Sequence, residues 1–173
     1  MVGDGLAEAV TLGPLHTAAG RDRVARMVAD AEAHGASVRT AGRIREADTH
    51  SGGYFVLPTV VTDLAADTAL ATEEQFGPVL PILSYTDVND AIARANDSEY
   101  GLGGTVWTKD LDRGYEVASQ VLSGTIWVNK HLDLPFDVPF GGAKQSGIGA
   151  EYGQEGLEEF TQAKTVNIAK QAW

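Results

Sequence analysis

The sequence predicts an α/β fold in which helices cover a layered, largely parallel sheet. Between residues 79 and 129, short apolar stretches alternate with stretches of helical spacing, in the order strand, helix, strand, helix, strand. The composition is that of a globular protein, with 43% hydrophobic and 21% charged residues. The 173 residues suit one domain, and no stretch reads as a linker that would divide it.

The first expected helix covers residues 21–35. Apolar side chains from Val24 to Ala31 recur at the spacing of one helical face. Gly35 is suited to end this helix, because glycine adopts the left-handed conformation at little cost. The N-terminal residues before it, including "TLGPLHTAAG", are typical of a loop.

Two strands are expected next, over residues 36–42 and 52–61. The second is rich in β-branched and aromatic residues. Pro58 lies inside it and cannot donate a ladder hydrogen bond, so this strand should break there or lie at an edge.

The second half of the chain carries two amphipathic helices between short apolar strands. Thr86 or Asp87 can cap the first of these helices. The second should bury one apolar face. The expected strands cover 79–85, 100–108 and 124–129, the helices cover 86–97 and 110–123, and the face comprises Leu111, Tyr115, Ala118 and Leu122.

The stretch 130–153 is rich in glycine, holds two prolines and shows little periodicity, which predicts a long irregular loop. Long loops without secondary structure are often functional. A last short helix over 154–164 and a final strand over 165–169 should follow.

Charge and composition exclude several classes of function. The net charge of −11 would repel a phosphate backbone or an anionic membrane, so we expect neither nucleic acid nor membrane as a partner. The chain has no cysteine, which rules out disulfides, iron–sulfur clusters and a thiolate nucleophile. No signal peptide or apolar span is evident, and a cytoplasmic location is expected by default.

Taken singly, the candidate motifs favour structural roles. The glycine-rich stretch 141–149 has the wrong order for a phosphate-binding loop and the wrong spacing for a dinucleotide fingerprint. The four histidines lie far apart, so no metal site is expected. The pair Glu73 and Glu74 would ordinarily be a solvated acidic turn.

Taken in order, four stretches resemble the aldehyde dehydrogenase superfamily, which uses NAD or NADP. They are "TEEQFGPVLPI", "ANDSEYGLGGTVWTKD", "SGTIWVN" and "PFGGAKQSGIGAEYGQEGLEEFTQAKTV". The resemblance is collinear over nearly the whole chain. It implies the α/β catalytic-domain fold of that family and an oxidoreductase function on aldehydes.

The resemblance also implies roles for individual residues. Glu74 would accept hydrogen bonds from the hydroxyls of the nicotinamide ribose, which suits the two oxygens of a carboxylate. Phe76 would lie against the nicotinamide ring and orient it for hydride transfer. The implied lining of the aldehyde tunnel is Asn129, His131, Leu134 and Phe140. Many relatives have an aromatic residue in place of Leu134.

The implied chemistry needs residues that the chain does not contain. In the family a cysteine thiolate attacks the aldehyde, hydride passes to NAD(P), and a glutamate activates water to release the acid. The chain resembles the last third of the family sequence, after that cysteine and after the cofactor domain. We therefore expect a truncated form that does not oxidise aldehydes alone, with residues 1–148 from the catalytic domain and 149–173 as a helix and oligomerisation strand.

Two alternatives remain open. The chain could be a non-catalytic oligomerising subunit that completes a site with a separate N-terminal chain, or a scaffold reused for non-redox chemistry on a small ligand. Because this segment packs against a cofactor domain in the family, it should leave apolar surface uncovered. We expect a homo-oligomer formed through the C-terminal strand and that surface.

Overall fold

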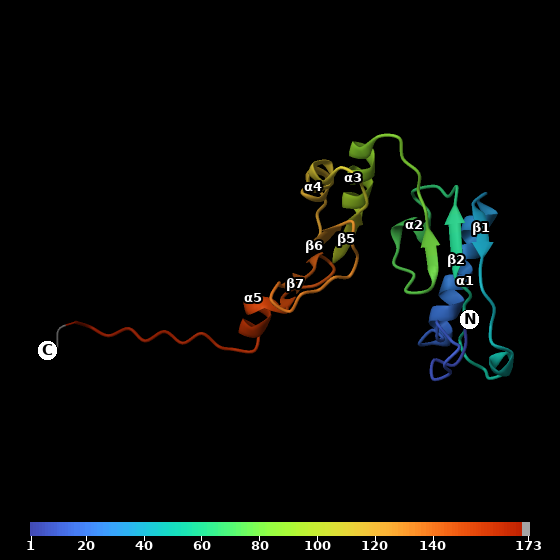
Figure 1. Ribbon diagram of the computed structural model, residues 1–173, viewed down its shortest axis with the longest axis horizontal. Helices are drawn as coiled ribbons and strands as arrows, with labels where there is room; N and C mark the ends of the chain where they lie inside the picture. Colours follow the sequence, from blue (N-terminus) through green and yellow to red (C-terminus); the bar gives the residue numbers. More distant parts are fainter. Residues whose placement is uncertain (171–173) are drawn as a thin grey trace. The chain divides into compact units, whose positions relative to one another are not determined.

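The computed structural model describes residues 1–170 and divides into two compact units, Met1–Ser84 and Tyr85–Trp173 (Figure 1). The chain was expected to form one domain, whereas its residues pack into two units. The boundary falls in a polar stretch without glycine or proline, so the sequence carries no linker signal there. Each unit is described by itself. The α/β class is confirmed, because helices and partly parallel sheets occur in both units.

The first unit packs one long helix against a three-stranded sheet. The order is β1–β2–β3, with β1 antiparallel and β3 parallel to β2. Thr17 caps α1 by accepting a hydrogen bond from the Gly20 amide, so the helix begins three residues before the expected start. The elements are α1 (Ala18–Ala33), β1 (Ser37–Thr40), a 3₁₀ turn (Glu46–Asp48), β2 (Thr59–Thr62), α2 (Ala69–Thr72) and β3 (Val79–Pro81).

The core of the first unit lies between α1 and this sheet. The predicted apolar face of α1 is buried, and Gly35 follows the helix with φ of 93°, as a C-terminal glycine should. Strand β2 begins directly after Pro58, which bears out the expected break. The buried cluster comprises Val24, Met27, Ala31, Ala36, Val61, Leu70 and Val79.

An ion pair fastens the N-terminal segment to the 3₁₀ turn. Arg45 donates from Nε and Nη2 to the Asp48 carboxylate at 2.6 and 2.8 Å, and the Asp4 amide donates to the same carboxylate at 3.0 Å. These hydrogen bonds, first that from Arg45, lower the pKa of Asp48 to about 2. Gly3 lies so close that a Cβ would stand 2.4 Å from Asp48 Oδ2. The Asp48 carboxylate thus joins the N-terminal segment to the 3₁₀ turn.

The second unit is built on a strand–helix–strand repeat. Strands β5 (Gly103–Val106) and β6 (Thr125–Val128) are parallel and are joined through α4 (Leu111–Ala118), while α3 (Val88–Asp97) precedes them. Asp87 caps α3 by accepting from the Asn89 amide, as predicted. Within residues 85–170, Trp127 of β6 is the one large apolar side chain that is buried.

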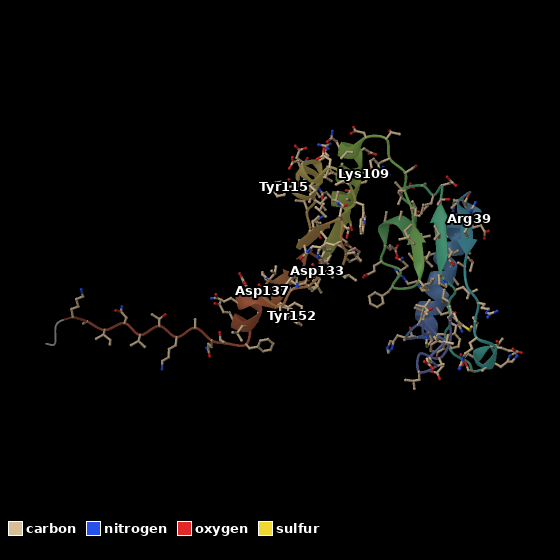
Figure 2. The ribbon with its side chains drawn as sticks, viewed as in Figure 1. Arg39, Lys109, Tyr115, Asp133, Asp137 and Tyr152 are labelled. Atoms are coloured by element: carbon tan, nitrogen blue, oxygen red, sulfur yellow. The ribbon has the colours of Figure 1, made fainter. Side chains whose placement is uncertain are left out.

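Helix α4 turns a different face to the sheet from the one expected. Leu111, Tyr115 and Leu122 are exposed, and Tyr115 is labelled in Figure 2. Gly114 is buried instead, and a Cβ there would stand 2.8–2.9 Å from side-chain atoms of Thr108 and Val128. The glycine lets the helix approach β6 closely, and this contact decides the orientation that the apolar pattern predicted wrongly.

The stretch after β6 is less irregular than expected, because it contributes three short strands. The antiparallel pairs are β4 (Tyr100–Gly101) with β8 (Ala143–Lys144) and β7 (Phe140–Gly141) with β9 (Ala150–Glu151). The last helix, α5 (Gly153–Glu158), is shorter than predicted.

The expected final strand over 165–169 forms no ladder within residues 1–170. This segment is exposed, and Figure 1 shows it as a single trace beyond α5. Strand pairing needs a partner edge, so an oligomerisation strand here stays a prediction, as does the boundary after residue 148. Residues 171–173 lie outside the described residues.

Several large apolar side chains within residues 1–170 are exposed, among them Phe76 at 82% and Phe160 at 90%. Within residues 1–170 no helix is long and apolar enough to cross a membrane.

Candidate nicotinamide and aldehyde contacts

Glu74 and Phe76 lie in the first unit, on the turn between α2 and β3 formed by residues 73–78. Among the hydrogen bonds and ion pairs of residues 1–170, those at this turn engage the Glu73 carboxylate and the Glu74 carbonyl and not the Glu74 carboxylate. Phe76 has φ of 51° and an 82% exposed ring. A bulky residue in this region costs about 1 kcal/mol or more, and such strain is common at functional sites.

The 73–78 turn is held in this conformation from both sides. The Gln75 side-chain amide donates to the Val79 carbonyl. Gly77 packs so tightly on α1 that a Cβ would stand 2.7 Å from Cγ2 of Val24. The turn therefore presents Phe76 outward on a rigid base.

A pocket of about 850 Å³ lies beside Phe76 within the first unit. Its volume falls in the range of small-ligand and cofactor sites. The Phe76 ring forms part of the wall together with the loop that leads into α1. The other lining residues include Leu12, Leu15, His16, Arg23 and Val56.

Arg23 is a residue of this site that the sequence did not reveal. It donates from Nη1 to the Glu74 carbonyl and from Nη2 to Glu73 Oε2, the latter at 3.0 Å. Arg23 stands 50 residues from its partners, on the polar side of a helix. No local pattern could have indicated the contact.

The other four predicted residues belong to the second unit, around the end of β6. His131 and Phe140 both lie against the buried Trp127, with ring centroids at 5.6 and 6.4 Å. Thr105 Oγ1 and His131 Nδ1 share a hydrogen bond of 2.8 Å. Leu134 is half-buried beside Asp133, whose carbonyl accepts the Trp127 indole N–H at 2.8 Å (Figure 2).

Asn129 stands at the end of β6, but its amide is already engaged. Oδ1 accepts from the Thr108 amide at 2.8 Å, and Nδ2 donates to the Thr108 carbonyl at 2.7 Å. Its φ is 56°, a region that asparagine tolerates better than most residues. Asn129 therefore joins the ends of β5 and β6, and its side chain has a structural function in this geometry.

The glycine-rich loop is fastened to the rest of the second unit by two polar side chains. Lys144 Nζ donates to the carbonyls of Asn96 and Ser98 at 2.8 Å, which caps the C-terminal end of α3. Ser146 Oγ accepts from the Gly101 amide at 2.9 Å. These contacts give Lys144 and Ser146 structural roles in this loop.

A second pocket, of about 360 Å³, opens between this loop and α5. Phe140 lies on its wall, half-buried. Tyr152, labelled in Figure 2, lies there too, and its ring meets that of Phe136 edge-on with 5.4 Å between centroids. The structure thus brings His131 and Phe140 to Trp127, with Leu134 next to Asp133, the residue that Trp127 contacts.

The fold and the two clusters define an α/β protein whose solved structural neighbours are aldehyde dehydrogenases. The NAD⁺ complex of aldehyde dehydrogenase from Bacillus cereus superposes with a TM-score of 0.87 at 37% identity, over 99% of this chain and 34% of that one. The NAD⁺ complex of Mycobacterium tuberculosis aldehyde dehydrogenase gives 0.80 at 43% identity, over 89% and 31%.

The amino-acid sequence leads to the same family. Betaine aldehyde dehydrogenase of Brucella anthropi is 43% identical over 167 residues, which are 96% of this chain and 34% of the relative. The aldehyde dehydrogenase family model matches residues 1–166. The chain belongs to the aldehyde dehydrogenase family, and it spans about a third of the length of the relatives it matches.

Proposed function

We propose that these 173 residues supply the nicotinamide contact and part of the aldehyde tunnel of an NAD(P)-dependent aldehyde oxidation. The observation that carries the proposal is the 73–78 turn, which holds an unpaired carboxylate and an outward aromatic ring two residues apart. Glu74 would accept the ribose hydroxyls, and Phe76 would lie against the ring that it orients. NAD or NADP, when bound, accepts the hydride.

The side chains of Glu74 and Phe76 fit the ribose and the ring of this cofactor. A carboxylate offers two acceptor oxygens, which match two neighbouring hydroxyls, and the exposed Phe76 face offers apolar contact for an aromatic ring. In the second unit, His131, Leu134 and Phe140 would form the tunnel wall, with Asn129 holding the strand ends behind them. Trp127 fixes their positions from the buried side.

The thiolate must come from elsewhere. The chain has no cysteine, so in our proposal both the nucleophile and the base that activates water belong to sequence outside these residues. The large apolar surface supports a covering partner, whether the remainder of one polypeptide or a separate N-terminal chain. A homo-oligomer through the segment 165–169 and a cytoplasmic location remain part of the proposal.

The test is an assay for NADH or NADPH formation with a short aliphatic aldehyde and with betaine aldehyde. The purified chain should form none. A chimera in which residues 1–166 replace the matching segment of the Brucella anthropi relative should be active. Glu74→Ala or Phe76→Ala in the chimera should raise the KM for the cofactor, whereas Glu32→Ala on the exposed side of α1 should not.

Two outcomes would contradict the proposal. Turnover by the purified chain would refute the external nucleophile. An active chimera whose cofactor KM is unchanged by both substitutions would refute the assigned contacts. A monomer by sedimentation would count against the proposed oligomer and leave the cofactor contact to the kinetic test.

A further inference from the structure

We propose that Arg23 is the positioning residue that holds the 73–78 turn so that Glu74, and not Glu73, is available to the cofactor. This inference rests on the function proposed above. Arg23 lies on α1, 51 positions before Glu74 in the sequence, and its guanidinium group donates a hydrogen bond to the turn.

Arg23 acts differently on the two neighbouring glutamates. It binds Glu73 through the carboxylate, with Nη2 and Oε2 at 3.0 Å, and it binds Glu74 through the backbone carbonyl. The Glu73 carboxylate is therefore engaged, while that of Glu74 stays free for a ligand. One guanidinium group thus engages the carboxylate of Glu73 and only the backbone of Glu74.

The position of Arg23 on α1 makes this contact rigid. The next residue, Val24, is 1% exposed and belongs to the core, so the helix backbone cannot shift here without disturbing that core. Val24 is also the residue against which Gly77 packs. Residues 23 and 24 therefore hold the two ends of the turn, one by hydrogen bonds and one by close packing.

The Arg23–Glu73 pair is too exposed to matter much for global stability, with side chains 37% and 58% accessible. Loss of this pair should instead increase the mobility of the 73–78 turn. This separates a positioning role from a general structural one, because a structural residue would lower the thermal midpoint.

The experiment compares Arg23→Gln, Arg23→Lys and the control Arg21→Gln in the full chain by ¹⁵N relaxation. Arg21 pairs with Asp22 and lies over the Tyr54 ring at 5.6 Å, with no contact to the turn. In Arg23→Gln, order parameters at Glu74 and Phe76 should fall from about 0.85 towards about 0.6 while the thermal midpoint holds. Arg23→Lys should restore part of the order, and Arg21→Gln should change nothing.

The effect on cofactor affinity is measured by titrating the ¹⁵N-labelled chain with oxidised nicotinamide mononucleotide and following the amide signals of Glu74 and Phe76. Arg23→Gln should weaken binding about five- to tenfold, which lies within the range of the net contribution of one ordinary hydrogen bond. Arg23→Lys should recover part of the affinity.

Unchanged order parameters in Arg23→Gln would overturn the positioning role. A loosened turn with unchanged affinity would overturn its link to the cofactor. A turn that loosens as expected in a chain that binds no mononucleotide even as wild type would instead count against the proposed cofactor contact and leave Arg23 as a brace of the turn.

Discussion

Asn129 offers the sharpest test of how the second unit is held together. Its side chain accepts from and donates to the backbone of Thr108, at 2.8 and 2.7 Å, and its own φ is 56°. Asn129→Ala removes both hydrogen bonds and leaves a residue that adopts this φ poorly. Asn129→Gly removes the same bonds and leaves a residue that adopts it freely.

Asn129→Ala should therefore lower the free energy of unfolding more than Asn129→Gly does. Two net hydrogen bonds at an exposed position contribute about 0.5–1 kcal/mol each. The left-handed conformation adds about 1 kcal/mol against alanine. We expect a loss of about 2–3 kcal/mol for Asn129→Ala and of about 1–2 kcal/mol for Asn129→Gly. If the side chain made no hydrogen bonds to Thr108, Asn129→Gly would show no loss.

Urea unfolding followed by tryptophan fluorescence measures this directly, because Trp107 and Trp127 belong to the second unit and the sequence has no tryptophan before position 107. Equal stability of Asn129→Ala and wild type would refute the strand-joining role. Equal losses for alanine and glycine would show that the backbone conformation contributes nothing.

Three further predictions test other contacts. Gly114→Ala should destabilise the second unit by about 1–2 kcal/mol in urea, because overlap with the strands outweighs the roughly 1 kcal/mol gain in helix propensity. Trp127→Ala should cost about 3–5 kcal/mol by circular dichroism, since it empties the centre of that unit. The stability lost in Asp48→Asn should be constant above about pH 5 and shrink progressively to a small remainder at about pH 2, because the native pKa of about 2 lies below the unfolded value near 3.9. Thermal midpoints measured across pH check this last difference, and a loss that persists undiminished at pH 2 would contradict it.

Much of the fold was predictable because local signals agree with the packing. The apolar spacing of α1, its terminal glycine and the Asp87 cap all act within a few residues, and each is present in the structure. The predicted orientation of α4 was wrong because the close contact of Gly114 with β6 outweighs the apolar pattern on the other face. The boundary between the units at residue 84 was hidden for a similar reason, since packing and not composition creates it.

The candidate site was predictable only through the family resemblance. Nothing local distinguishes Glu74 from Glu73, and the structure separates them only through Arg23, which lies about 50 residues away. Trp127 was visible as an aromatic residue in an apolar strand, but its contacts with His131 and Phe140 depend on the loop that follows. A strand over 165–169 requires a partner edge, and no strand within residues 1–170 pairs with it.

The central claim is that this chain contacts the nicotinamide but takes its nucleophile from elsewhere. The most direct measurement is the rate of NADH formation by the chimera that carries residues 1–166, with and without the Glu74→Ala substitution, beside the purified chain alone. We predict no NADH from the chain, turnover by the chimera, and a raised cofactor KM in the variant. NADH formed by the chain alone would contradict the account.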